Sequence, residues 1–75
     1  MKSIILKALK SYLEGSIEKH VANIRLHLNN PTGVAEHPDH LETIEKELGI
    51  IAEFEDKLNV LEKYFGTKSK EVING

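Results

Sequence analysis

The chain has 75 residues, a formal net charge of −2 and 40% hydrophobic residues, with no cysteine and no tryptophan. A chain this short buries only about 60% of the surface that its unfolded form exposes, so its core usually needs a disulfide, a bound metal ion or a partner to be stable. The lack of cysteine excludes disulfides, thiolate metal sites and cysteine nucleophiles. No segment approaches the roughly 20 apolar residues of a membrane span, and a pI near 6.1 disfavours general nucleic-acid binding.

The first long segment without proline predicts one helix over about residues 3–29. Its apolar residues recur at intervals of three and four, which is the period of an amphipathic helix and not of a strand. Three of them are eleven residues apart, a period that keeps the apolar stripe nearly straight along the helix. The stripe comprises Leu6, Leu9, Leu13, Ile17, Val21, Ile24 and Leu28.

The second long segment predicts a helix over about residues 38–65. Pro38 suits the first helical position, and Asp39 and Glu42 fall in the first turn, where the helix dipole favours anions. Gly66 is available as a left-handed cap, and we expect residues 67–75 to form a flexible tail because they show no apolar period. The apolar surface is wider than one seam and comprises Leu41, Ile44, Leu48, Ile50, Ile51, Phe54, Leu58, Val60, Leu61, Tyr64 and Phe65.

Two such helices joined by a turn over about residues 30–37 predict an all-α, antiparallel two-helix hairpin in one domain over residues 1–66. Residue i then lies near residue 68 − i, which places Gly15 and Gly49 beside the middle of the partner helix. Each glycine indicates either close helix approach or a tolerated weak point. Charge agrees with the pairing, because residues 3–29 carry +2 and residues 39–65 carry −5.

The surplus of apolar positions predicts that the hairpin completes its core by self-association into a dimer or a larger helical bundle. Replacing Phe54 with aspartate should then abolish assembly. The residues expected in the core and the oligomer interface are Leu6, Leu13, Ile17, Ile24, Leu48, Ile51, Phe54, Leu58 and Leu61.

The turn gathers ionisable side chains at the start of the second helix. Capping and turn packing are the main interpretation, and an anion or nucleotide on the free amides is the alternative. This possible ligand or turn site comprises Gly33, Glu36, His37, Asp39 and His40. His27, His37 and His40 are candidate ligands of a metal ion, although the electropositive start of a helix opposes a cation there.

We expect neither catalysis nor a cofactor. General acid–base catalysis needs titratable groups that converge in a water-excluded cleft, and a two-helix hairpin has no interior cavity of its own. No HExxH, GxSxG or phosphate-cradling glycine loop occurs in the sequence. His20 and His27 fall at the edge of the first stripe, either as packed boundary residues or as a pH-sensitive subunit contact.

Residues 29–65 resemble small uncharacterised proteins of T4-like marine bacteriophages. The resemblance is carried by Pro31, Gly33, the turn residues 36–39 (Glu-His-Pro-Asp), Leu41 and Ile44, and the second-helix segments 52–58 and 61–65. It covers about half of the chain and implies a helical hairpin made in the cytoplasm of an infected bacterial host or carried in the virion. It implies no activity.

Two functions remain open from the sequence. The first is a self-associating, non-catalytic interaction protein, a phage accessory or virion component whose partners are further copies of itself and a host or virion protein. The second is an oligomeric protein that sequesters a nucleotide or another small anion in pockets between subunits.

Overall fold

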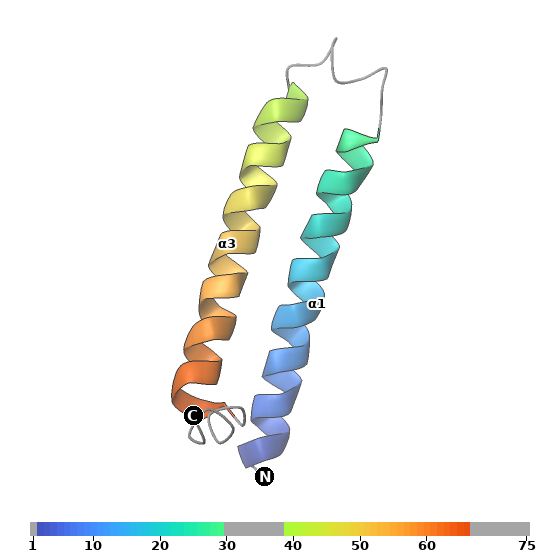
Figure 1. Cartoon of the computed structure of the whole chain (residues 1–75). Helices are drawn as coiled ribbons and strands as arrows, with labels where there is room; N and C mark the ends of the chain where they lie inside the picture. The colour runs from blue at the N-terminus through green and yellow to red at the C-terminus, as the bar shows by residue number, and fades with distance from the viewer. Residues whose placement is uncertain (1, 30–38, 67–75) are drawn as a thin grey trace, which may run out of the picture.

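A computed structural model describes residues 2–29 and 39–66, which contain two α-helices, α1 (Lys2–Leu28) and α3 (Asp39–Phe65). The helices lie side by side and run antiparallel (Figure 1). The predicted all-α hairpin is therefore confirmed. We call the end that holds residues 2 and 66 the open end, and the end that holds residues 29 and 39 the loop end. Pro38, the predicted turn at 30–37 and the tail at 67–75 lie outside the described residues.

Charges at the helix termini suit the helix dipole at three of the four ends. The first turn of α1 has no acidic residue, but its last turn carries Arg25 and His27. The first turn of α3 carries Asp39 and Glu42, and its last turn carries Lys63. Acids near an N-terminus and bases near a C-terminus each stabilise a helix by roughly 0.3–1 kcal/mol.

The helices meet along one line of buried and half-buried side chains, which we call the seam. Its residues are spaced alternately four and three apart on both helices, which is the heptad spacing of a coiled coil. On α1 the seam comprises Leu6, Lys10, Leu13, Ile17, His20, Ile24 and His27; on α3 it comprises His40, Ile44, Glu47, Ile51, Phe54, Leu58 and Leu61.

The predicted apolar stripes are therefore wrong at several positions, where the residue in the seam is a neighbour of the predicted one. Leu9 and Leu28 on α1, and Leu41 and Leu48 on α3, are exposed on the sides of the hairpin. Their places in the seam are taken by polar neighbours one residue away in the sequence. The reason is that each of these polar side chains finds a polar partner across the seam, which satisfies its hydrogen-bonding groups. The predicted register places residue i near residue 68 − i and therefore His20 near residue 48. His20 faces Glu47, so the prediction holds to within one residue.

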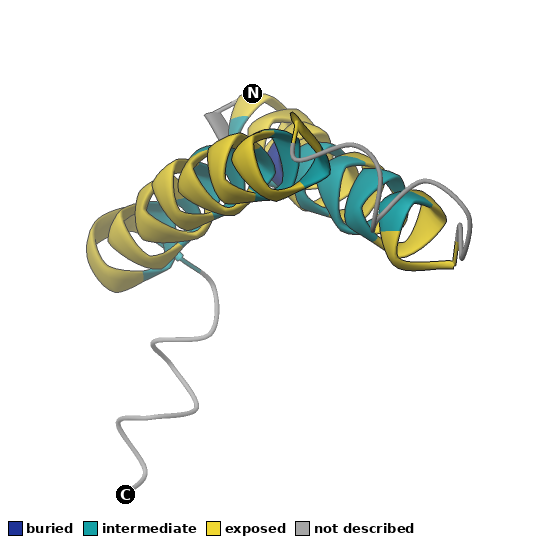
Figure 2. Cartoon of the chain, turned by 90° about the horizontal axis from the view of Figure 1, so that it is seen from above, coloured by how far each residue is buried: buried dark blue, intermediate teal, exposed yellow. Residues whose placement is uncertain are grey.

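The core is thin. Leu13, 4% exposed, is the only hydrophobic residue in the described part of the chain that is buried, and the other apolar residues of the seam are half-buried. Figure 2 shows half-buried residues on the inner sides of both helices and exposed residues over the outer sides. Two helices alone leave every seam residue close to solvent on at least one side.

Gly15 and Gly49 do not mark a close approach of the two helices within the hairpin, because a Cβ atom built at either glycine would meet no atom within 4 Å. The other interpretation, a tolerated weak point in each helix, stays a prediction. Gly66 is not a left-handed cap, since no described glycine has a positive φ. Its N–H donates to the carbonyl oxygen of Glu62 at 3.0 Å, and a Cβ there would overlap that oxygen.

Candidate functional site

The best-formed polar contact in the seam joins His20 of α1 to Glu47 of α3. The His20 Nδ1 and Glu47 Oε1 atoms are 2.5 Å apart, and the two side chains are only 15% and 16% exposed. Asn23 adds a second bond, because its side-chain amide donates to Glu47 Oε2 at 3.4 Å. Both carboxylate oxygens of Glu47 are thus bonded to α1, which fixes the two helices in one register.

A second polar contact lies at the loop end, where His27 of α1 meets His40 of α3. Their Nδ1 atoms are 2.6 Å apart and their rings are nearly perpendicular, at 73°. One imidazole can donate its N–H to the other only if the acceptor nitrogen carries no proton. The contact therefore forms a hydrogen bond with a proton on one of the two Nδ1 atoms.

The third polar contact lies toward the open end. Lys10 Nζ of α1 is 3.0 Å from Glu62 Oε2 of α3, with the two side chains 35% and 20% exposed. The other oxygen of this carboxylate, Glu62 Oε1, is buried and has no hydrogen-bond partner among the described residues. This contact leaves one acceptor unsatisfied, unlike the contact at Glu47.

Aromatic side chains of the two helices also contact each other around Phe54 of α3. The Phe54 ring lies 6.1 Å from the Tyr12 ring in an edge-on arrangement and 6.1 Å from the His20 ring in a stacked one. Lys57 Nζ lies 5.5 Å from the centre of the same ring. Phe54 is therefore a structural residue of the hairpin itself.

The predicted core and interface residues divide into two groups. Leu48 is 55% exposed and lies outside the seam. The remainder lie in the seam, where all but Leu13 are half-buried: Leu6, Ile17, Ile24, Ile51, Phe54, Leu58 and Leu61.

The possible ligand site falls largely outside the described residues, which exclude Gly33, Glu36 and His37. Asp39 is exposed, while His40 is half-buried against His27. Of the three candidate metal ligands, the structure brings His27 and His40 together. Within residues 2–29 and 39–66, no group of three or more histidines or acids is placed to hold a metal ion.

Sequence reasoning missed most of the polar contacts between the helices. Lys10 and Glu47 in the seam, and Asn23 and Glu62 beside it, were not predicted to take part in helix pairing, although each contacts the other helix. A signal exists for the two seam residues alone, because Lys10 and Glu47 share the four-and-three spacing of their apolar neighbours in the seam.

Many large hydrophobic residues lie on the surface of the hairpin and not in the seam. Eleven of them in the described part are exposed, with exposed fractions from 43% to 72%. Large exposed apolar patches are typical of interaction sites. The eleven residues are Ile4, Ile5, Leu9, Tyr12, Leu26, Leu28, Leu41, Leu48, Val60, Tyr64 and Phe65.

A shallow apolar cavity of about 490 Å³ lies at the open end, between the start of α1 and the end of α3. Its lining is mainly apolar and also includes the charged residues Lys7, Lys10 and Glu62. A cavity of this size falls in the range of small-molecule sites. The lining residues are Ser3, Ile4, Leu6, Lys7, Lys10, Leu61, Glu62, Phe65 and Gly66.

Comparison with known proteins identifies no relative. No protein-family model matches the chain, and no curated protein or solved structure matches it. Neither described helix is long and apolar enough to cross a membrane. Function must therefore be inferred from the seam and from the exposed faces of the hairpin.

Proposed function

We propose that this chain is a non-catalytic interaction protein that completes its core by self-association into a helical bundle. The observation that carries this proposal is the imbalance between core and surface: within the described residues, one hydrophobic side chain is buried and eleven large ones are exposed. A small domain with so thin a core is marginal alone, and association supplies the missing burial.

The energetics of association are consistent with this proposal. Fully covering one large apolar side chain stabilises by about 1.5–3 kcal/mol. Because these side chains are 43–72% exposed, covering about half of the set would contribute roughly 5–10 kcal/mol, which is of the same size as the roughly 4–15 kcal/mol that association costs in lost freedom. Covering most of the set would contribute roughly 10–20 kcal/mol.

A non-catalytic role is supported by how the ionisable groups are used. The half-buried histidines and acids bind one another across the seam, as in the pairs His20 with Glu47 and His27 with His40. General acid–base catalysis would instead need such groups free to face a substrate in a water-excluded cleft.

We also propose a viral setting, in the cytoplasm of an infected bacterium or in the virion. This rests on the resemblance of residues 29–65 to small phage proteins. In that setting the hairpin would act through contacts with further copies of itself and with a host or virion protein.

A second candidate function is the sequestering of a nucleotide or another small anion. The observation that favours it is the cavity at the open end, whose mainly apolar lining includes Lys7 together with Lys10 and its ion-pair partner Glu62. A ligand that binds only the native state must raise the melting temperature. A panel of nucleotides in a thermal-shift assay tests this candidate, and a Lys7→Ala variant should lose any shift that this cavity produces.

Assembly is tested on the surface of the hairpin, since Phe54→Asp would also remove the ring contacts that Phe54 makes within one chain. Leu48→Asp places a charge at an exposed apolar position and should convert the oligomer to monomer in sedimentation. Ala22→Asp, which adds the same charge at an exposed position on the outer side of α1, is the matched control. An oligomer that survives Leu48→Asp, Ile5→Asp and Tyr64→Asp would refute assembly through the apolar faces.

A further inference from the structure

The hairpin has two distinct sides. In an antiparallel helix pair, residues that precede a seam position on either helix fall on one side, and residues that follow a seam position fall on the other. Ile5 precedes Leu6 and Leu41 follows His40, so we call the two sides the Ile5 face and the Leu41 face.

Most exposed apolar residues of the Ile5 face lie near the open end, and its lysines lie closer to the loop end. The apolar residues near the open end come from both helices and are Ile5, Leu9, Tyr12, Val60 and Tyr64; Leu26, which is also exposed, lies at the loop end. Closer to the loop end it carries Lys19 and Lys46, both exposed. Lys57 and Glu53, which lie between these two regions, pair with each other at 3.4 Å.

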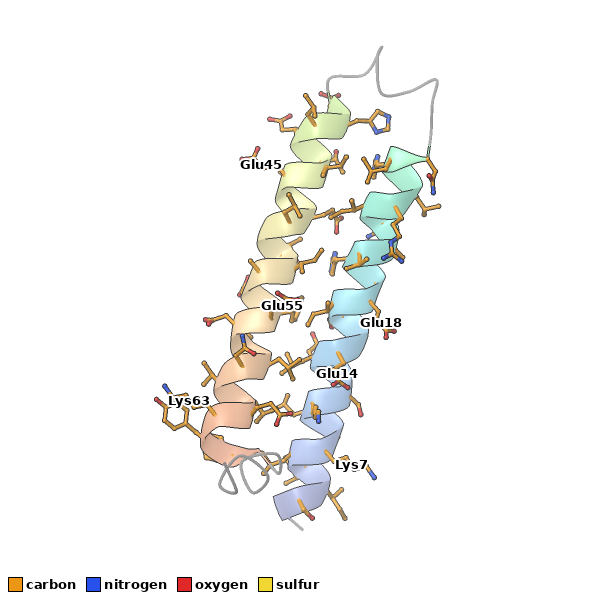
Figure 3. All side chains as sticks on the ribbon, viewed as in Figure 1. Lys7, Glu14, Glu18, Glu45, Glu55 and Lys63 are labelled. Carbon is orange, nitrogen blue, oxygen red and sulfur yellow. The ribbon has the colours of Figure 1, made fainter. Side chains whose placement is uncertain are left out.

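The Leu41 face has the reverse arrangement. Its apolar residues lie near the loop end and comprise Leu28, Leu41 and Leu48, which are exposed, and Val21, which is half-buried. Three exposed acids, Glu14, Glu18 and Glu55, follow toward the open end, and Figure 3 shows them in the middle part of the hairpin. Arg25 and Glu45 lie among the apolar residues of this face, and Lys7 lies at its open end.

The two faces are complementary when one hairpin is turned end for end. The apolar open end of the Ile5 face then meets the apolar loop end of the Leu41 face, and lysines meet glutamates. Helix register brings Ile5 opposite Leu41, Tyr12 opposite Leu48, and Lys19 opposite Glu55. Placing either face on a copy of itself would bring like charges together if the copies ran parallel, and would cover charged residues with apolar ones if they ran antiparallel; both disfavour that contact.

We propose that the Ile5 face of one copy docks on the Leu41 face of a second, antiparallel copy. This inference rests on the proposed self-association and adds its geometry. The contact is heterologous, meaning that the two partners use different surfaces. Each copy therefore keeps one face free for a further copy, and the assembly extends beyond a dimer.

Cross-linking tests this arrangement directly, because the chain contains no cysteine. Ile5→Cys and Leu41→Cys lie near opposite ends of one hairpin, about 30 Å apart at 1.5 Å per residue, so a short bismaleimide can join them only between copies. A mixture of the two single variants should give a covalent dimer of twice 8.5 kDa. Ala22→Cys on the outer side is the control and should not cross-link to either variant.

Two outcomes would overturn the head-to-tail contact. One is efficient cross-linking of Ile5→Cys to itself, and the other is the absence of a covalent dimer in the mixture. The native mass of the unmodified chain separates the two proposals. A monomer refutes self-association itself, whereas an oligomer without the mixed cross-link refutes only this geometry.

Charge reversal gives an independent measurement. Lys19→Glu should weaken association about two- to fivefold, the range that one exposed charge pair contributes. Adding Glu55→Lys in the same chain should restore it, because every contact then regains an opposite pair. A double variant that associates no better than Lys19→Glu would contradict the predicted register.

Discussion

The two halves of the seam differ in what they contribute to the fold. The half nearer the open end is mostly apolar and contains Leu13, the one buried hydrophobic residue of the described chain. The half nearer the loop end contains His20, His27, His40 and Glu47, which bind each other across the helices. Apolar contacts are non-directional, whereas buried polar pairs penalise every register that separates them. The apolar half therefore provides stability, and the polar half fixes the alignment.

The largest expected effect is in the apolar half. Leu13→Ala should lower the free energy of unfolding by about 2–4 kcal/mol, because it removes buried methyl groups and leaves a cavity. Leu26→Ala, at a 71% exposed position of the same helix, should change it by less than about 0.5 kcal/mol. Denaturant unfolding at one fixed protein concentration measures both. Equal losses in the two variants would mean that Leu13 is not the centre of the core.

The next largest effect is expected at Glu47. Glu47→Ala leaves His20 and Asn23 without their acceptor in the seam and should cost about 1–3 kcal/mol. Glu45→Ala removes an exposed acid two residues away and serves as the control. If both variants lose the same stability by urea unfolding, the Glu47 contacts add nothing to the fold.

A smaller effect is expected for the histidine pair at the loop end. His27→Ala, His40→Ala and the double variant form a cycle whose coupling energy should be about 1 kcal/mol, the value of one net hydrogen bond. The control is the same cycle for His27 and Glu47. These two side chains form no hydrogen bond with each other in the described part of the chain, so their coupling energy should be close to zero. Strict additivity in the first cycle would contradict the pairing.

The smallest change should raise stability. Gly15→Ala and Gly49→Ala should each stabilise the hairpin by about 0.5–1 kcal/mol, because alanine is the better helix former and its Cβ meets no atom of the chain. Melting temperature is the measurement. A loss of stability at either glycine, at a concentration where the chain is associated, would place that glycine against another copy.

The helical hairpin was predictable from the sequence because long proline-free segments with a three-and-four period have few other solutions. Which residues of each helix form the seam was not predictable in the same way. Hydrophobicity places Leu28 and Leu41 in the seam ahead of His27 and His40, yet both leucines are exposed. A polar residue is stable in the seam only when it has a polar partner on the other helix, and that partner can be identified only once the helices are aligned.

The candidate site shows the same division. That His27 and His40 would reach one end of the hairpin followed from the antiparallel topology, and the structure places their Nδ1 atoms 2.6 Å apart. The pairing of Lys10 with Glu62 could not be foreseen from spacing, since these residues sit 52 positions apart and neither belongs to a recognisable motif. The aromatic contact between Tyr12 and Phe54 likewise depends on the final register.

The most direct test of the central claim is the native mass in solution, measured by light scattering at two protein concentrations. The imbalance between one buried and eleven exposed hydrophobic residues predicts a stable multiple of 8.5 kDa at both concentrations. A monodisperse particle of 8.5 kDa at both concentrations would contradict self-association and would leave the apolar faces to a different protein.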